Sequence, residues 1–156
     1  MLTMNTVSKF LSDRHMIYVH SMETVESAMN IMDKEGTDSI GVQSYGRFAG
    51  IFTRSDLVSR VLQKGLRPER TLVQNVMTPD PQTISPETPI SEAYRMMRDL
   101  KVSHLPVVDD NGRVFLGIVT EDDMRDDIQS FLDKAMREHE MILGYIHGEQ
   151  YGLCAR

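Results

Sequence analysis

The hydrophobic residues in the first half of the chain change their spacing in a fixed order. A short extended segment at 16–20 is followed by apolar residues three and four positions apart over 24–35. Two short apolar runs then occur at 39–43 and 48–52. Apolar residues at intervals of three and four predict an amphipathic helix, and short apolar runs bounded by turn residues predict strands. The pattern therefore predicts the order β-α-β-β, with a further helix after the last strand.

The second half of the chain repeats this order. We predict an extended segment at 82–85, a helix at 90–100, and strands at 104–108 and 114–119. The two helices align through the sequence SAMNIM in the first half and EAYRMM in the second. The second half contains a short insertion relative to the first. It falls in VVDDNGRVFLG, where Asp-Asn-Gly is a hairpin-turn signal. An insertion confined to a turn is typical of a true structural repeat.

Both halves end in the same motif, which reads GIFTRSDL in the first and GIVTEDDM in the second. Thr53 and Asp56, like Thr120 and Asp123, have the spacing of a capped helix start. A helix N-terminus presents free N–H groups and a partial positive charge, which favour a polar or anionic ligand. Each motif therefore predicts a helix cap, and each is also a candidate binding position.

A long helix is predicted near the C-terminal end. Residues 121–143 contain neither Gly nor Pro, and their apolar side chains recur three and four positions apart. We expect the helix to end at Gly144 and the residues EQYGLCAR to form a loose tail. One face is expected to pack on the repeats, and the rest of the apolar stripe on a second subunit or a partner. The alternative is a helix that packs only within its own chain.

These elements predict an α+β fold of two β-α-β-β-α repeats packed with pseudo-two-fold symmetry, plus a long C-terminal helix. One unit of about 60 residues makes a thin core alone, so two units are expected to pack through their apolar faces. We assign repeat one to 7–65, a linker to 66–75, repeat two to 76–130, and a C-terminal extension and tail to 131–156.

Composition narrows the classes of function. Of the 156 residues, 40% are hydrophobic and 26% are charged, as in ordinary soluble proteins. The net charge of −6 without a basic run argues against binding to nucleic acid or to an anionic membrane surface. No apolar run is long enough to span a membrane, and the N-terminus lacks a signal-peptide pattern. The single cysteine cannot form an internal disulfide, so we expect a cytoplasmic protein.

The sequence shows no recognisable catalytic or metal-binding pattern. No Ser-His-Asp or Cys-His arrangement can be argued from it, so we expect no enzymatic activity. His139, His147 and Cys154 share the C-terminal region, but their spacing fits no standard zinc pattern. We therefore expect no metal site.

Three stretches carry a resemblance to a known family: VMTPDPQTISPETPISEAYRMM, VSHLPVVDDNGRVFLGIVTEDDM and GIFTRSDLVSRVL. They resemble a tandem pair of cystathionine-β-synthase (CBS) domains, also called a Bateman module, and the resemblance covers about residues 7–130. It implies a regulatory module that binds an adenosine-containing ligand, most often AMP, ADP or ATP, in clefts between the repeats. Some members bind S-adenosylmethionine or dinucleotides such as NAD. The resemblance also implies homodimers that regulate a partner protein and require no cofactor.

The resemblance further implies which residues bind the ligand. The Asp of each shared motif would accept hydrogen bonds from the two ribose hydroxyls, and the Thr would offer its hydroxyl to ribose or phosphate. The start of the strand at 104–108 would form a cleft wall and place a histidine near phosphate, and the two extended segments would wall the adenine. The implied set is Ile17, Tyr18, Ile40, Thr53, Asp56, Thr83, Ile84, Ser103, His104, Leu105, Thr120 and Asp123.

The two halves are not equivalent as candidate sites. Repeat two has His104 and Pro106 beside its motif, whereas repeat one has Asp38 and Gly41 at the matching strand. A carboxylate at Asp38 would repel phosphate, although Arg54 beside the motif is a possible phosphate partner. We therefore predict that repeat two is the better site. Two functions stay open: a nucleotide-sensing regulatory module, and a structural dimerisation module whose clefts hold no functional ligand.

Overall fold

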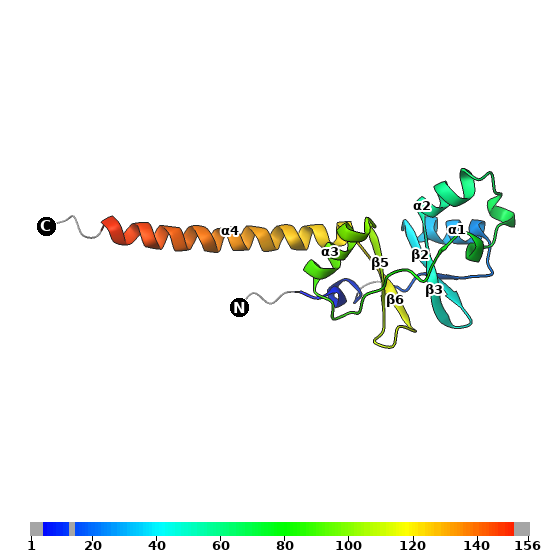
Figure 1. The fold of residues 1–156 in the computed structure, drawn as a ribbon, viewed down its shortest axis with the longest axis horizontal. Coiled ribbons are helices and arrows are strands. Elements are labelled where there is room, and N and C mark those ends of the chain that lie inside the picture. The colour runs from blue at the N-terminus through cyan, green and yellow to red at the C-terminus, as the bar shows by residue number, and fades with distance from the viewer. Residues whose placement is uncertain (1–4, 13–14, 152–156) are drawn as a thin grey trace. The chain divides into compact units, whose positions relative to one another are not determined.

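Repeat one is built around a four-stranded sheet in the computed structural model, which describes residues 5–12 and 15–151 (Figure 1). Its strands, in order across the sheet, are β1 (Tyr18–His20), β2 (Ser39–Ser44), β3 (Arg47–Thr53) and β4 (Thr78–Pro79). β1 is parallel to β2, whereas β3 is antiparallel to both of its neighbours. The sequence prediction missed β4, because two residues are too few to show a hydrophobic period.

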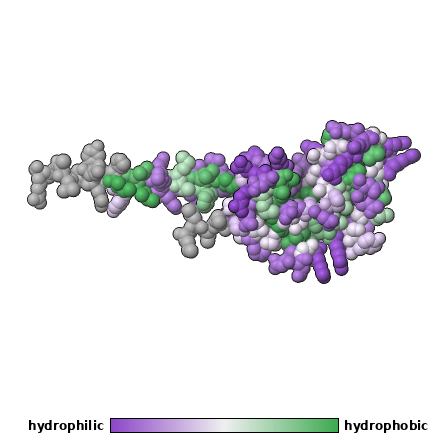
Figure 2. All heavy atoms as spheres, in the orientation of Figure 1, coloured by the Kyte–Doolittle hydropathy of each residue, from purple (hydrophilic) through white to green (hydrophobic). Residues whose placement is uncertain are grey.

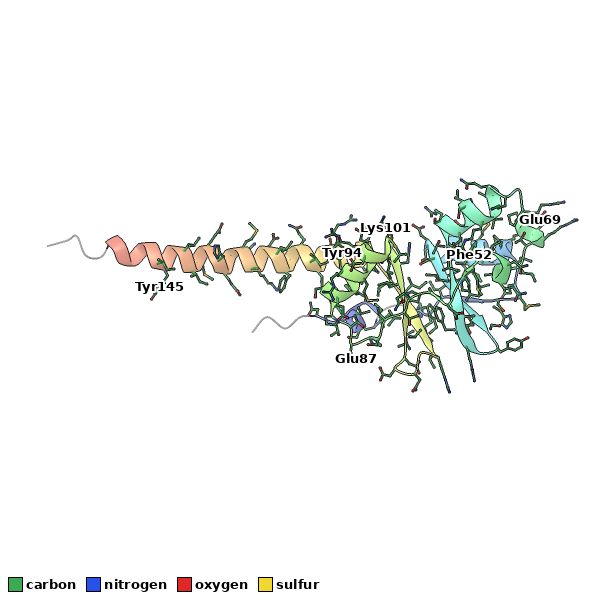
Figure 3. All side chains as sticks on the ribbon, viewed as in Figure 1. Phe52, Glu69, Glu87, Tyr94, Lys101 and Tyr145 are labelled. Carbon is green, nitrogen blue, oxygen red and sulfur yellow. The ribbon has the colours of Figure 1, made fainter. Side chains whose placement is uncertain are left out.

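Helix α1 (Val25–Glu35) begins and ends on recognisable signals. The Thr24 hydroxyl accepts a hydrogen bond from Ser27 N–H, and Gly36 ends the helix in the left-handed conformation at φ 64°. After β3 the chain forms the short helix α2 (Arg54–Asp56) and then a π-helical turn at Leu57–Leu62. The side chains of α1 and the sheet close a core around Phe52, which Figure 3 labels. Its buried members are Val19, Val25, Ala28, Met32, Ile40, Val42, Phe52, Val61, Val73 and Val76.

Repeat two has a smaller sheet. It contains α3 (Ile90–Leu100) and the antiparallel pair β5 (His104–Val108) and β6 (Phe115–Thr120). The expected extended segment at 82–85 pairs with β5 through a single parallel bridge between Ile84 and Val107 and does not form a full strand. The second hairpin strand begins at Phe115, one residue later than predicted, because the side chain of Asp109 binds the backbone N–H of Val114.

The segment that precedes each repeat lies on the other repeat. Ile90 N–H donates to Asn5 O at 3.0 Å, just as Val25 N–H donates to Thr71 O at 2.9 Å. The pseudo-two-fold match extends to two further pairs of hydrogen bonds: Val7 N to Thr88 O and Ser8 N to Pro86 O on one side, Val73 N to Glu23 O and Gln74 N to Ser21 O on the other. In Figure 1 the dark-blue segment at Val7–Phe10 accordingly lies beside α3. The first residue of α1 and the first residue of α3 thus each donate to a backbone carbonyl that lies outside their own repeat.

The two repeats also meet through their hairpins. The rings of Phe48 and Phe115 stack with centroids 5.3 Å apart and planes 7° apart. Phe48 N–H donates to Arg113 O at 3.3 Å, which links the two hairpins through the backbone. The expected α+β fold of two packed β-α-β-β-α repeats is confirmed, with the reduced first strand of repeat two as its main departure.

The described part of the second unit, which begins at Asp122, is formed by α4 (Glu121–Tyr151). The long helix is confirmed, but the prediction that Gly144 ends it was wrong, because the helix continues through Gly144 to Tyr151. Of the expected loose tail, 149–151 are helical, and 152–156 lie outside the described residues. A glycine disfavours a helix interior by only about 1 kcal/mol, which is too little to stop a helix without a turn signal after it.

Candidate functional site

The shared motif of repeat one forms a complete capping box at the start of α2. Thr53 N–H and Thr53 Oγ1 each lie 3.0 Å from Asp56 Oδ2, and Asp56 N–H donates to Thr53 Oγ1 at 3.3 Å. Both side chains therefore satisfy backbone N–H groups that the helix leaves unpaired. The cap predicted from the sequence at Thr53 and Asp56 is confirmed.

The other carboxylate oxygen of Asp56 is bound by residues that the sequence prediction missed. Thr78 Oγ1 donates to Asp56 Oδ1 at 3.2 Å, and Arg60 Nε lies 3.5 Å from the same oxygen. Arg60 Nη1 in turn donates to the carbonyls of Val76 at 3.3 Å and Met77 at 2.6 Å. Only 7% of Asp56 is exposed, so this is a buried and hydrogen-bonded carboxylate. The i, i+4 spacing of Asp56 and Arg60 was a usable signal, whereas Thr78 is distant in sequence and gave none.

The remaining repeat-one residues lie in different surroundings. Tyr18 is exposed on β1, and the carbonyl of Ile17 accepts from Gly41 N–H at 3.2 Å, so the extended segment lies along β2 as expected. The side chain of Ile40 has no exposed surface and belongs to the core.

Asp38 and Arg54 form an ion pair with an N–O distance of 2.5 Å, and the side chains are 55% and 71% exposed. Each was expected to act on a phosphate, one by repulsion and the other by attraction. Their pairing brings opposite charges together, which reduces both effects at this point of repeat one.

In repeat two, the structure brings three predicted residues together at the ends of β5 and β6. His104 and Thr120 are opposite one another in the β5–β6 pair. Glu121 N–H donates to the Ser103 carbonyl at 3.0 Å, which fixes the place where β6 ends and α4 begins. His104 and Thr120 are half-buried and Ser103 is exposed.

The other predicted residues of repeat two sit deeper or follow along the helix. Leu105 and Ile84 are buried, and Ile84 N–H donates to Pro106 O at 3.0 Å, so the segment at 82–85 lies against β5. Thr83 next to it is half-buried. Asp123 is half-buried in the first turn of α4, three residues after Thr120 as in repeat one. The ligand contacts of these side chains stay predictions.

The electrostatics around this end of repeat two are mixed. The first two turns of α4 carry Glu121, Asp122, Asp123, Asp126 and Asp127. Carboxylates at a helix N-terminus compensate the helix dipole. They also reduce the attraction of this region for a highly charged anion such as a bare triphosphate.

The β5–β6 turn contains a carboxylate with a perturbed pKa. Hydrogen bonds from the backbone of Val114 and then of Arg113, both 2.8 Å from Asp109 Oδ1, lower the pKa of Asp109 below its ordinary value. The ionised carboxylate is the better acceptor, so these bonds favour its charged form. Asp109 therefore holds the shape of the hairpin that touches repeat one.

Two further properties of the described residues bear on the class of site. Within residues 5–12 and 15–151, no three or more His, Cys, Asp or Glu side chains gather as a metal site would require. None of the helices formed by the described part of the chain has both the length and the apolar character needed to cross a bilayer.

Comparison with known proteins gives a consistent match. The family model for the CBS domain matches the chain twice, at residues 7–63 and 73–130. The chain is 35% identical over 111 residues to the CBS domain-containing protein CBSCBSPB2 of Arabidopsis thaliana. That match covers 71% of this chain but only 19% of the plant protein, so the chain spans about a fifth of that relative.

Solved structures share the fold. A protein with CBS domains from Burkholderia ambifaria superimposes with a TM-score of 0.73 at 23% identity, covering 80% of this chain and 93% of that chain. A CBS domain protein from Pyrobaculum aerophilum, solved in complex with AMP, superimposes with a TM-score of 0.66 at 18% identity, covering 74% and 86%.

Proposed function

The chain belongs to the CBS-domain family, with two copies of the domain, and from this we propose that it is a regulatory module that binds an adenosine-containing nucleotide at repeat two. The ligand class is AMP, ADP or ATP, and the binding event is passed to a partner protein. Proteins of this family are in general regulatory and not catalytic, which agrees with the expectation from the sequence.

The observation that carries the choice of repeat is the set of contacts that the motif carboxylate of repeat one already makes within the protein. In repeat one, both oxygens of Asp56 are already bound by Thr53, Thr78 and Arg60. In repeat two, His104 and Thr120 lie opposite one another where β6 passes into α4. A threonine hydroxyl and an imidazole at the start of a long helix are suited to a phosphorylated ligand.

Each proposed contact has a specific chemical reason. Asp123 would accept hydrogen bonds from the two ribose hydroxyls, because one carboxylate has two acceptor oxygens. Thr120 and His104, with Ser103, would donate to phosphate. Leu105, Thr83 and Ile84 would provide the wall for the adenine ring. A solved CBS protein in complex with AMP supports the ligand class, since it has the same fold as this chain.

Regulation requires that the ligand distinguish two arrangements of the module. A ligand shifts a conformational equilibrium only by its difference in affinity for the two states. Such a shift would alter the contacts between the repeats. These are the stacking of Phe48 on Phe115 and the hydrogen bonds of the two segments that pack on the opposite repeat. S-adenosylmethionine and NAD share the adenosine group and are the alternative ligands.

The exposed apolar side chains of α4 support the second function, dimerisation. Figure 2 shows apolar residues distributed along this helix among charged ones, and Tyr145 projects from it in Figure 3. Those exposed are Phe131, Leu132, Met136, Met141, Ile142, Leu143, Tyr145 and Ile146. A run of exposed apolar residues is typical of a surface that another chain covers. We propose that a second copy of the protein covers it, and light scattering with Ile142→Glu tests this: the variant should be monomeric and the wild type dimeric.

The function is tested by thermal unfolding with AMP, ADP, ATP, NAD and S-adenosylmethionine. A ligand at about 100 times its dissociation constant stabilises by about 2.7 kcal/mol, which raises the melting temperature by roughly 5–10 °C for a chain of this size. Asp123→Ala should reduce that rise more than Asp56→Ala, each compared with its own ligand-free melting temperature. The absence of a rise with all five compounds would refute the proposed sensing. Equal losses in the two variants, or a larger loss from Asp56→Ala, would refute the choice of repeat two.

A further inference from the structure

Asp56 joins three segments of the first unit. It caps α2 through Thr53, it lies 3.5 Å from Arg60 on the π-helical turn Leu57–Leu62, and it accepts from Thr78 on β4. Arg60 holds the same β4 segment a second time through the carbonyls of Val76 and Met77. Because β4 lies at the start of repeat two as assigned from the sequence (76–130), the carboxylate connects repeat one to the first residues of repeat two.

Most of the acceptor positions of Asp56 are occupied by the protein itself. Oδ2 accepts from Thr53 N–H and Thr53 Oγ1, each at 3.0 Å, and Oδ1 accepts from Thr78 Oγ1 at 3.2 Å beside the Arg60 guanidinium. A carboxylate offers about four acceptor positions in all. Two ribose hydroxyls could bind here only by displacing donors that are already in place.

Repeat two lacks both Arg60 and Thr78 at the aligned positions. When the motifs are aligned on Thr53 and Thr120, the position of Arg60 is taken by Asp127, whose carboxylate cannot form an ion pair with Asp123. The position of Thr78, aligned through the segments that contain Val7 and Val73, is taken by Ser12, whose hydroxyl donates to Lys9 O at 3.2 Å. Neither aligned position of repeat two therefore supplies the contact that Arg60 or Thr78 makes with Asp56 in repeat one.

We propose that Arg60 and Thr78 form a latch that withholds Asp56 from ligand, so that the chain binds one nucleotide and not two, and that opening the latch admits a second nucleotide at repeat one. Arg60 and Thr78 act through Asp56 and are positioning residues that determine which repeat is occupied. This inference rests on the proposed function, because it takes the same ligand class and the same ribose-accepting role for the motif carboxylate.

Titration calorimetry with AMP on the full chain tests the latch. The wild type is expected to bind one AMP, and Asp123→Ala to bind none. In the Asp123→Ala background, Thr78→Val removes the hydroxyl donor while keeping the shape, and it should restore one AMP per chain. The affinity of repeat one should rise by about tenfold or more, the scale set by one hydrogen bond to a charged group. Arg60→Met, which keeps the aliphatic stem, should act in the same direction.

Matched variants show whether restored AMP binding comes from releasing Asp56 or from a general destabilisation of the fold. Thr78→Ser and Arg60→Lys keep a donor and should leave AMP binding absent in the Asp123→Ala background. Thr71→Val removes a hydroxyl that donates to Arg67 O, outside the latch, and should also leave it absent. Adding Asp56→Ala to Thr78→Val should abolish the restored binding, because the released carboxylate is the group that binds ribose.

The possible results distinguish the two proposals. If the wild type binds no AMP and Asp123→Ala changes nothing, the proposed function fails at repeat two, and a gain of binding in Thr78→Val alone still supports the latch. If the wild type binds one AMP but neither Thr78→Val nor Arg60→Met adds a second, the latch is refuted and the proposed function stands. If the wild type binds two AMP molecules and Asp56→Ala removes one, the latch is also refuted, because repeat one is then open without any change.

Discussion

The ring of Phe115 occupies the space in which a side chain on Gly41 would have to lie. A Cβ atom built on Gly41 would be 2.5 Å from Phe115 Cε1 and 2.6 Å from Cζ. The same ring stacks on Phe48, and only 2% of Phe115 is exposed. Since Gly41 and Phe48 belong to repeat one and Phe115 to repeat two, this aromatic contact positions the two repeats on each other. A glycine at this point of β2 is therefore required by packing.

We expect Gly41→Ala to lower the free energy of unfolding by about 1–3 kcal/mol, the usual range for overpacking a core. The clash lies with a buried ring stacked on Phe48, which has little room to move away. Urea unfolding measures the change. The double variant Gly41→Ala/Phe115→Leu should be more stable than the sum of the two single changes predicts, because leucine leaves space for the methyl group. Strict additivity would show that the two residues do not compete for the same space.

The order of the elements was predictable because each has its own local signal. α1 shows a helical period, a threonine cap and a C-terminal glycine, and β2 and β3 are short apolar runs between turn residues. The packing of the segments around Val7 and Val73, each on the opposite repeat, was not predictable. It depends on backbone hydrogen bonds between residues distant in sequence, and backbone bonds leave no trace in side-chain patterns.

The candidate site shows the same division. The capping role of Thr53 and Asp56 follows from their spacing and is confirmed. The i, i+4 spacing of Asp56 and Arg60 was a usable signal for their ion pair. The sequence shows no sign that Thr78 binds Asp56, because that contact requires β4 to pair with β3. The side chain of Ile40 lies wholly in the core, and this placement was not predictable, because strand alternation does not say which neighbour covers a residue. The ligand contact of Ile40 stays a prediction.

Gly144→Ala should stabilise α4 by up to about 1 kcal/mol. Gly144 lies inside the helix. Apart from the neighbouring helix backbone, no atom of the described residues lies within 4 Å of a Cβ built on it, so alanine adds helix propensity without a clash. Circular dichroism should show equal or greater helicity and a higher melting temperature. A loss of helicity would indicate that the glycine is needed for close approach by another chain.

Val7→Ala and Val73→Ala should destabilise the protein by similar amounts, about 2 kcal/mol each from two buried methyl groups plus a cavity. Both side chains are fully buried in pseudo-equivalent positions on the opposite repeat. Hydrogen exchange should locate the effects. Val7→Ala should accelerate the amide of Ile90, which donates to Asn5 O, and Val73→Ala should accelerate that of Val25, which donates to Thr71 O.

The half-exposed Val58 provides the control for these changes, and Val58→Ala should cost under about 0.5 kcal/mol. If Val7→Ala accelerated amide hydrogen exchange at Val25 instead of Ile90, the finding that each preceding segment packs on the other repeat would be contradicted.

Asp109 should make the β5–β6 turn sensitive to acid. Its pKa is lowered by hydrogen bonds from Val114 and Arg113, so its ionised form stabilises the turn. A carboxylate with a lowered folded-state pKa contributes stability that is present above its unfolded value of about 3.9 and is lost as pH falls through the folded value. NMR titration of the Asp109 carboxyl carbon should give a midpoint below 3.9, and the amide protons of Arg113 and Val114 should shift with the same midpoint. Asp109→Asn keeps an acceptor oxygen without the charge, so these amide shifts should no longer titrate with that midpoint. A midpoint at or above the unfolded value, or amide shifts unchanged from the wild type in Asp109→Asn, would show that other groups hold the turn.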